Sequence, residues 1–398
     1  EKEASSDASD SEKETQENEA NEGLFDDNES EVEGNDADEN KVEENEAQEN
    51  ETEENEVEEN EAETSDIDDE EKEKWIENVK KMIKNETDLI NYILRNINNV
   101  SPRIKKSIGD DCAVLKISKD GYLVFTTDTS LLGPHFSSDY SPMEIGYKCL
   151  ASNLSDIAAM GCKPKYLLMA ITLPSLDEKW LKGFYGGINS LVRKYKLALI
   201  GGDINKGPLS ISFQVIGEST TNVLFRDGAK TGDDIYVSGN IGLARAALIF
   251  EKKRQKKNYN SFKNYLRKPN PRIELGLELS KFASSCIDIS DGLAKDLSSI
   301  LIQSNKGASI VFEDIPTSRR IKNLLSTKEL YESLLGGGED YELCFTSNKK
   351  YTRKISSISK KLNIKLTKIG EVKGKKLRYY NDGVEIHPKF HGFDHFQS

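Results

Sequence analysis

The chain has 398 residues and a formal net charge of −14, which combines two parts of opposite charge. Residues 1–74 carry a net charge of −30, and residues 75–398 carry +16. The sequence has no apolar stretch near the roughly 20 residues that span a bilayer, and no secretory signal pattern at its start. These features predict a soluble, cytoplasmic protein.

Residues 1–74 are low in complexity and are expected to be disordered. A five-residue pattern runs from Lys41 to Ser65 as KVEEN, EAQEN, ETEEN, EVEEN and EAETS. Large apolar residues are almost missing, so burial cannot offset the entropy lost on ordering. The segment could act as a polyanion that screens the basic remainder, or it could be a solubilising tail.

The remaining residues, about 320, exceed the size at which one hydrophobic core stops growing. We therefore expect two domains, 75–220 and 221–398, joined near residues 219–223. The five cysteines are widely spaced and form no Cys-x-x-Cys pair. This predicts buried free thiols in a reducing compartment.

Apolar periodicity predicts the elements of the first domain. A helix is expected at 75–99. Two further helices are expected at 141–161, with Ser141 as cap and Pro142 in its first turn, and at 176–196. Strands are expected at 122–128, 165–174, 197–203 and 209–219.

The second domain repeats the alternation of strands and helices. Strands are expected at 234–240, 286–290, 308–314, 341–347 and 364–372, and helices at 241–253, 270–283, 293–304 and 349–363. The alternation predicts two layered α/β domains. The basic stretch 251–268 interrupts it and is expected to be a surface excursion or an extended helix, with weak potential as a polyanion-binding patch.

Acidic residues recur beside Gly, Ser or Thr in five stretches near apolar runs: IGDDCAVL, VFTTDTS, SNLSDIAAMG, LIGGDINKG and CIDISDGL. Each Asp alone could be a helix cap or a turn former. Five such stretches at one place would carry a charge that requires compensation by metal ions. Oxygen ligands without soft ligands suit Mg²⁺, so the pattern favours several magnesium ions bridging a polyphosphate.

Covalent catalysis is not indicated by the sequence. The four histidines show no spacing with Cys or Ser that suggests a nucleophile and its base. Gly201 and Gly202 follow an apolar run, where glycine lets backbone N–H groups approach a phosphate. The stretch is neither a P-loop nor a dinucleotide fingerprint.

Eight ordered motifs carry a family resemblance: IGDDCAVL, TTDTSLLGPHF, NLSDIAAMG, LIGGDINKGPLSIS, DGAKTGDDIYVSG, CIDISDGL, GGGEDYELCFT and HGFDHF. They resemble the thiamine-monophosphate kinase family, of the superfamily typified by aminoimidazole ribonucleotide synthetase. The resemblance implies a PurM-like fold of two α/β domains and a homodimer with a shared barrel. It also implies ATP-dependent phosphorylation of thiamine monophosphate to thiamine diphosphate by direct in-line transfer. Because the acceptor is itself a phosphate, no catalytic acid or base is expected.

The resemblance also implies roles for individual residues. ATP would contact Gly202, Asp203, Arg226 and Ser290. The acceptor would contact His135, Phe393 and Glu339, or Asp340 in place of Glu339. Magnesium would be held by Asp111, Thr126, Thr127, Asp128, Asp156, Asp203, Asp288 and Asp291.

Alternatives remain at this point. Another ATP-dependent enzyme of the superfamily, of the selenophosphate synthetase or ribonucleotide cyclo-ligase type, is the nearest. A nucleotide-binding regulator that works through its acidic segment belongs to a different class. No nucleic-acid or membrane partner is expected.

Overall fold

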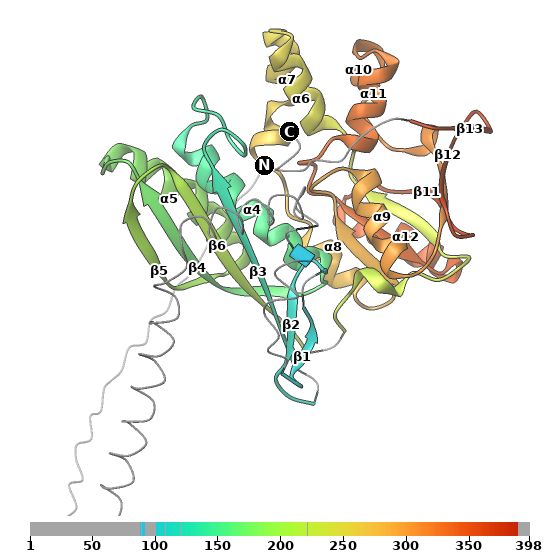
Figure 1. Ribbon diagram of the computed structural model, residues 1–398, viewed down its shortest axis with the longest axis horizontal. Helices are drawn as coiled ribbons and strands as arrows, with labels where there is room; N and C mark the ends of the chain where they lie inside the picture. Colours follow the sequence, from blue (N-terminus) through green and yellow to red (C-terminus); the bar gives the residue numbers. More distant parts are fainter. Residues whose placement is uncertain are drawn as a thin grey trace, which may run out of the picture. The chain divides into compact units, whose positions relative to one another are not determined.

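The computed structural model describes residues 88, 90, 91, 101–107, 109–119, 121–220 and 222–388, all within one compact unit. The expectations for residues 1–74, most of the helix at 75–99 and the terminal motif with Phe393 lie outside the described residues. The described part contains two sheets with helices packed on them, so the expected fold class, two layered α/β domains, is confirmed (Figure 1). Among the described residues, no helix is long and apolar enough to cross a membrane.

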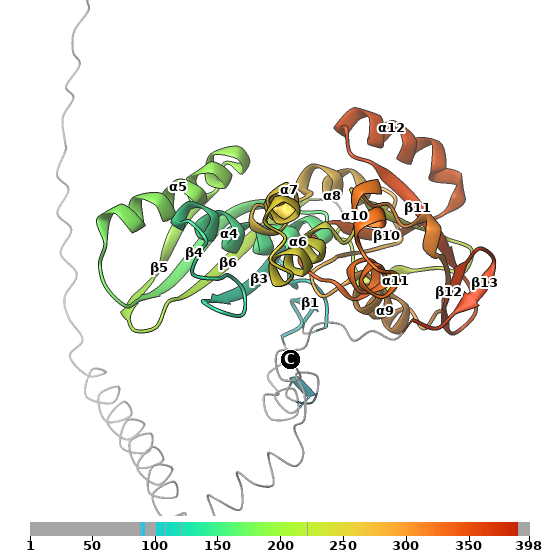
Figure 2. The same ribbon diagram turned by 90° about the horizontal axis from the view of Figure 1, so that it is seen from above.

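The first sheet positions the residues of the expected nucleotide site. Its strands lie in the order β1 (Ile104–Lys106), β2 (Ala113–Lys116), β3 (Tyr122–Leu131), β6 (Ser210–Ser219), β4 (Lys163–Leu173) and β5 (Ala198–Lys206). Neighbours are antiparallel except for β4 and β5. Helices α4 (Pro142–Ala159) and α5 (Glu178–Tyr195) lie on the same side of this sheet (Figure 2).

The sequence specifies the start of α4 directly. Ser141 and Glu144 form a reciprocal capping box, and Pro142 occupies the first turn. Most of the helix is buried because it packs against β3 and β6 on one side and against α5 on another. The side chain of Asp156, near the end of α4, is half-buried between these elements.

The second sheet has the order β13 (Val384–Ile386), β12 (Leu377–Asn381), β9 (Ala308–Val311), β11 (Leu366–Val372), β7 (Asp234–Ser238), β10 (Leu343–Ser347) and β8 (Ser285–Asp288). Only β12 and β9 pair in parallel. Its helices are α6 (Leu243–Lys252), α7 (Lys256–Arg267), α8 (Ile273–Leu279), α9 (Leu293–Gln303), α10 (Arg319–Leu324), α11 (Thr327–Tyr331) and α12 (Thr352–Leu362).

The two sheets meet through α4 and α8, within one shared apolar core. A Cβ atom at Gly276 would lie 2.0 Å from the carbonyl oxygen of Ala158, so only glycine permits this close helix contact. The largest apolar cluster includes Leu154 of α4 together with Phe345 of β10. The packing of α4 in this core brings its end beside strand β8.

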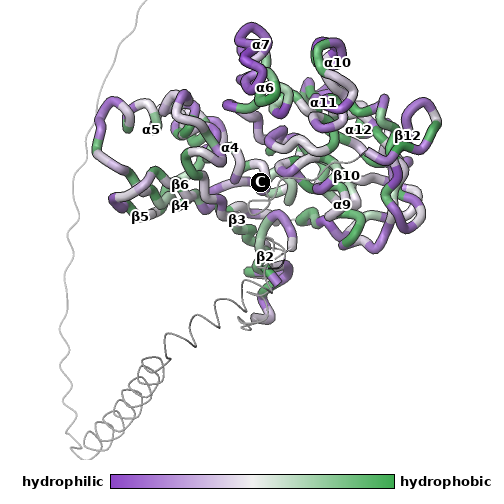
Figure 3. The backbone as a smooth tube through the Cα atoms, turned by 45° about the horizontal axis from the view of Figure 1, so that its top comes forward, coloured by the Kyte–Doolittle hydropathy of each residue, from purple (hydrophilic) through white to green (hydrophobic). Residues whose placement is uncertain are grey.

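The structure also describes the basic stretch 251–268 and the five cysteines. Of the two alternatives for the stretch 251–268, the helix applies, because the stretch forms the end of α6, a turn, and α7. Most of its residues are exposed, but Phe262, Leu266 and Arg267 are buried. The exposed part of α7 is hydrophilic (Figure 3). All five cysteines are buried and free, as expected.

Candidate active site

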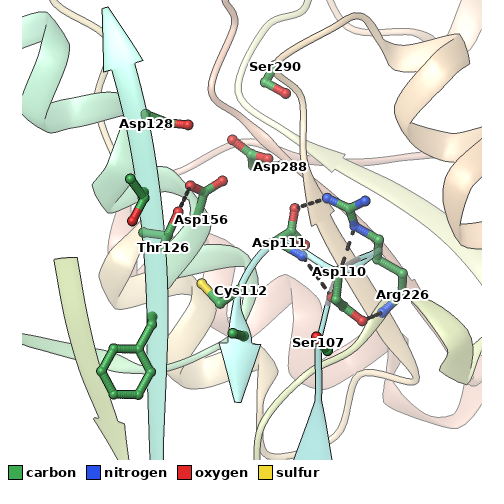
Figure 4. A pocket seen from close by; sticks show the side chains of 13 residues that line it. Ser107, Asp110, Asp111, Cys112, Thr126, Asp128, Asp156, Arg226, Asp288 and Ser290 are labelled. Atoms are coloured by element: carbon green, nitrogen blue, oxygen red, sulfur yellow. Dashed lines mark hydrogen bonds and ion pairs between the residues drawn. The ribbon is translucent and has the colours of Figure 1, made fainter. Parts of the chain in front are cut away.

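A pocket of about 290 Å³ lies where the two sheets meet, and polar side chains from both of them line it (Figure 4). The turn before β2, strand β3, helix α4, the segment after β6 and the end of β8 all contribute. The lining residues are Ser107, Asp110, Asp111, Cys112, Ala113, Phe125, Thr126, Thr127, Asp128, Asp156, Arg226, Asp288 and Ser290. Four of the five acidic stretches, which are far apart in the sequence, therefore meet here.

Three carboxylates form the centre of this pocket. One oxygen from each of Asp111, Asp156 and Asp288 lies within 4.8 Å of the other two. The Thr126 hydroxyl donates to Asp156 Oδ2 at 2.5 Å, and the Ser155 hydroxyl donates to Asp288 Oδ2 at 2.7 Å. Hydroxyl groups on neighbouring elements thus fix two of the carboxylates in place.

Burial makes the ionised form of these groups costly. It raises the pKa of Asp111, Asp156 and Asp288, and the charges of neighbouring aspartates raise the pKa values of Asp156 and Asp288 further. Burial also raises the pKa of Asp128, and burial together with the charge of Asp111 raises that of Asp110 to about 6. The pocket concentrates negative charge that the described residues compensate only in part.

Arg226 supplies the positive charge at one side of the pocket. Its Nη2 donates to Asp111 Oδ1 at 2.6 Å, and its backbone N–H donates to Asp110 Oδ2 at 3.3 Å. The other oxygen of Asp111, Oδ2, is buried and accepts no hydrogen bond among the described residues. An unsatisfied buried carboxylate oxygen in this position suits a cation.

The turn after β8 is held by a residue that the sequence interpretation missed. Asp296 in α9 is buried and accepts the backbone N–H groups of Ser290, Asp291 and Gly292, each at 3.1 Å. Gly292 has φ +117°, which favours glycine. Ser290 lines the pocket, whereas the carboxylate of Asp291 pairs with Lys295 at 2.7 Å and is not among the described lining residues.

Of the expected acceptor residues, Glu339 adjoins the Ser290 turn that lines the pocket. The backbone N–H of Glu339 donates to Ser290 O at 2.8 Å. In addition to burial, the negative charge of the Glu339 side chain raises the pKa of Asp128. Asp340 instead accepts the N–H of Gly242 at 2.7 Å at the start of α6, and burial raises its pKa to about 8. The Asp340 carboxylate is thus engaged at the start of α6, whereas the charge of Glu339 acts on Asp128 in the pocket.

His135 and Glu339 share a contact that the sequence did not suggest. Lys148 in α4 donates to the carbonyl oxygen of His135 at 2.8 Å and forms an ion pair with the Glu339 carboxylate. A possible signal was present, since Lys148 stands among apolar and small residues of a helix that is otherwise almost entirely buried. The ring atom Nδ1 of His135 accepts the N–H of Leu131 at 3.0 Å.

Gly202 and Asp203 are not brought into this pocket. They lie on the exposed strand β5, where Gly202 pairs with Met169, which pairs with Phe213, which in turn pairs with Asp128. Three strand spacings correspond to about 14 Å. A Cβ atom at Gly202 would lie 1.9 Å from the carbonyl oxygen of Met169, so within this chain the glycine serves strand packing.

The sequence matches two successive domains of one family. Residues 109–219 match "AIR synthase related protein, N-terminal domain", and residues 230–380 match "AIR synthase related protein, C-terminal domain". The fold and the site therefore define a two-domain protein of the AIR synthase-related, PurM-like class. The basic stretch 251–268 lies within the residues that match the second domain.

Curated relatives narrow this class. Thiamine-monophosphate kinase of Buchnera aphidicola (subsp. Schizaphis graminum) is 42% identical over 78% of this chain and 99% of its own length, and that of Escherichia coli K12 is 38% identical over 74% and 92%. A solved structure of AaThiL complexed with AMPPCP and TMP has 31% identity and a TM-score of 0.67, covering 78% of this chain and 97% of its own. The chain belongs to the thiamine-monophosphate kinase family, and it is an enzyme.

Proposed function

We propose that the protein transfers the γ-phosphoryl group of ATP directly to thiamine monophosphate and releases thiamine diphosphate and ADP. The observation that carries this proposal is the convergence of Asp111, Asp128, Asp156 and Asp288 around one pocket. AaThiL was solved with AMPPCP, an ATP analogue, and with TMP, which supports the same pair of substrates for this chain. The acceptor phosphate is mostly deprotonated at neutral pH, so no general base is required.

The residues of the pocket fit magnesium. They offer hard oxygen ligands, and the buried Asp111 Oδ2 lacks a hydrogen-bond donor among the described residues. Magnesium there would neutralise the negative charge that the nucleotide and the acceptor phosphate bring together. The proposed ligand set is Asp111, Thr126, Thr127, Asp128, Asp156 and Asp288, with Asp291 at its margin after release from Lys295.

The chain's other groups then bind and orient the two substrates. Arg226 and Ser290 line the pocket and would contact the nucleotide. Glu339 lies near enough to Asp128 to affect its pKa and is linked to His135 through Lys148, and both residues would contact the acceptor. Phe393, outside the described residues, would offer an aromatic face to the thiamine rings. Holding both phosphates in line is the main contribution that such a transfer needs.

We also propose a homodimer formed through the first sheet. Edge strand β5 exposes Leu199, Ile200 and Ile204, which are 57%, 55% and 68% exposed. An apolar, unprotected edge strand favours pairing with another chain. A second copy seated on β5 would also explain Gly202 and Asp203, because their expected nucleotide contacts would then be made in the partner's pocket.

Purified protein tests the function directly. With ATP, Mg²⁺ and thiamine monophosphate we expect thiamine diphosphate and ADP in equal amounts, resolved by chromatography. Phosphorylation of a different acceptor, with thiamine monophosphate left unchanged, would favour another activity of the superfamily. The domain boundaries near residues 75 and 220 and the cytoplasmic location stay predictions.

A further inference from the structure

Arg267, at the end of α7, is a buried cation in which all three guanidinium nitrogens are engaged. Its side chain is 4% exposed. Nη1 donates to the carbonyl oxygen of Asp139 at 3.2 Å and to Glu144 Oε2 at 3.1 Å. Nε donates to the Tyr259 hydroxyl at 3.0 Å. Nη2 forms an ion pair with the Asp139 carboxylate. The guanidinium carbon lies 4.1 Å from the centre of the Tyr140 ring. Only arginine combines this fork of donors with ring stacking.

Lys148 is a second buried cation, and it binds the other end of the same loop. Its side chain is 6% exposed. Its ammonium group donates to the carbonyl oxygen of His135 at 2.8 Å, pairs with Glu339, and lies 5.7 Å from the centre of the Tyr140 ring. Loop 133–140 is therefore held at His135 by Lys148 and at Asp139 by Arg267, with the Tyr140 ring in contact with both cations.

This network includes both described residues that the proposed function assigns to the acceptor. His135 belongs to the loop itself, and the Glu339 carboxylate is held by Lys148. Because a buried charge that loses its partner is costly, the two cations and their anions resist separate movement. On the nucleotide side, Arg226 is held by Asp111, and the turn at Ser290 is held by the Asp296 carboxylate. The link from Glu339 to Ser290 runs through the Glu339 backbone N–H and does not involve the Glu339 carboxylate.

We propose that Arg267 is a positioning residue for the phosphate acceptor. It fixes loop 133–140 and, through Tyr140 and Lys148, the carboxylate of Glu339, and it does not itself touch either substrate. This inference rests on the proposed function, because that function assigns His135 and Glu339 to thiamine monophosphate. Its consequence is a selective effect on acceptor binding.

Two variants test the inference through steady-state kinetics with each substrate varied in turn. Arg267→Lys keeps the charge and loses the fork and the stacking, and Asp139→Asn removes the anion at a side chain that is 55% exposed. We expect the KM for thiamine monophosphate to rise at least about tenfold in both, because small misplacements of positioning groups have large effects. The KM for ATP should stay within about twofold of the wild-type value.

Arg320→Met is the matched control, because Arg320 lies in α10 and contacts the same helix α7 at another place. Arg320 donates to Asn258 of α7 at 2.9 Å and lies 5.7 Å from the centre of the Phe262 ring, away from loop 133–140. Its loss should leave both KM values unchanged. An unchanged KM for thiamine monophosphate in Asp139→Asn, or equal rises in both KM values, would overturn the inference even if Arg267→Lys failed to fold. A wild-type protein that forms no thiamine diphosphate would instead overturn the proposed function.

Discussion

At the level of single residues, the aspartates of the pocket are arranged to bind cations, and their clustering lowers the stability of the fold. Buried carboxylates that face one another raise each other's pKa values, and a bound cation would reverse this effect. Residues whose removal would increase the stability of the folded state are retained because they serve a function. Activity and stability should therefore respond in opposite directions to their substitution.

Asp128→Asn should show this opposition. Loss of one carboxylate from the pocket should lower kcat by about 100-fold or more, the order found when one charge-stabilising group is removed from an active site. The magnesium-free variant should melt at the wild-type temperature or above it, because burial raises the pKa of Asp128. Asp314→Asn, at an exposed site, is the control for both measurements. Wild-type turnover by the Asp128 variant would contradict the role we assign to it.

Stability without magnesium should fall as the pH rises. A carboxyl group whose pKa is higher in the folded state binds more protons there, so it stabilises the fold at low pH and loses this effect as the pH rises through the folded-state pKa. For Asp110 that value is about 6, and the folded-state pKa values of Asp111, Asp156 and Asp288 are also raised. Urea unfolding between pH 5 and about pH 8 should show the decline, and added Mg²⁺ should restore stability most at the high end. If the free energy of unfolding changed with pH at the same slope in the wild type and in Asp110→Asn, this explanation would be contradicted.

The sequence identified most of the pocket's carboxylates, because acidic residues beside small ones at strand and helix ends are an unusual pattern. It did not identify Asp296 or Lys148, whose importance depends on backbone groups and side chains far away in the sequence. The pattern could not show that Asp291 pairs with Lys295, and the role of Asp291 as a metal ligand stays a prediction.

At the level of elements, strand β5 shows how packing limits such inferences. Its glycines suggested an approach to phosphate, but the backbone of β4 already requires Gly202. Strand pairing places Gly202 and Asp203 away from Asp128, and no local motif can reveal that distance. Similarly, α7 was ambiguous because its polar residues are numerous and its buried ones are few.

Gly202→Ala should destabilise the protein, whereas Gly186→Ala should not. A Cβ atom at Gly202 would clash with Met169 O, and we expect a loss of about 1–3 kcal/mol in the free energy of unfolding. At Gly186, inside α5, the nearest atom would be the Met143 Cε at 3.4 Å, so alanine should stabilise the helix by about 0.5–1 kcal/mol. Equal effects of the two substitutions in chemical denaturation would contradict the packing explanation.

At the level of the whole molecule, we expect the acidic segment 1–74 to be separable from the catalytic part. All pocket residues lie in the unit Lys81–Ser398. Removing residues 1–74 should leave kcat and both KM values within about twofold at physiological salt, where charges beyond about 8 Å are largely screened. A collapse of activity in the truncated protein would assign the segment a direct role in catalysis.

The central claim is that aspartates from both sheets hold divalent cations at one place beside the nucleotide. Anomalous diffraction from crystals grown with Mn²⁺ and AMPPCP would test it most directly. We predict manganese peaks within about 2.3 Å of carboxylate oxygens of Asp111, Asp156 and Asp288, near the range of oxygen ligation for hard cations. Bound nucleotide with manganese absent from these three residues would contradict the account.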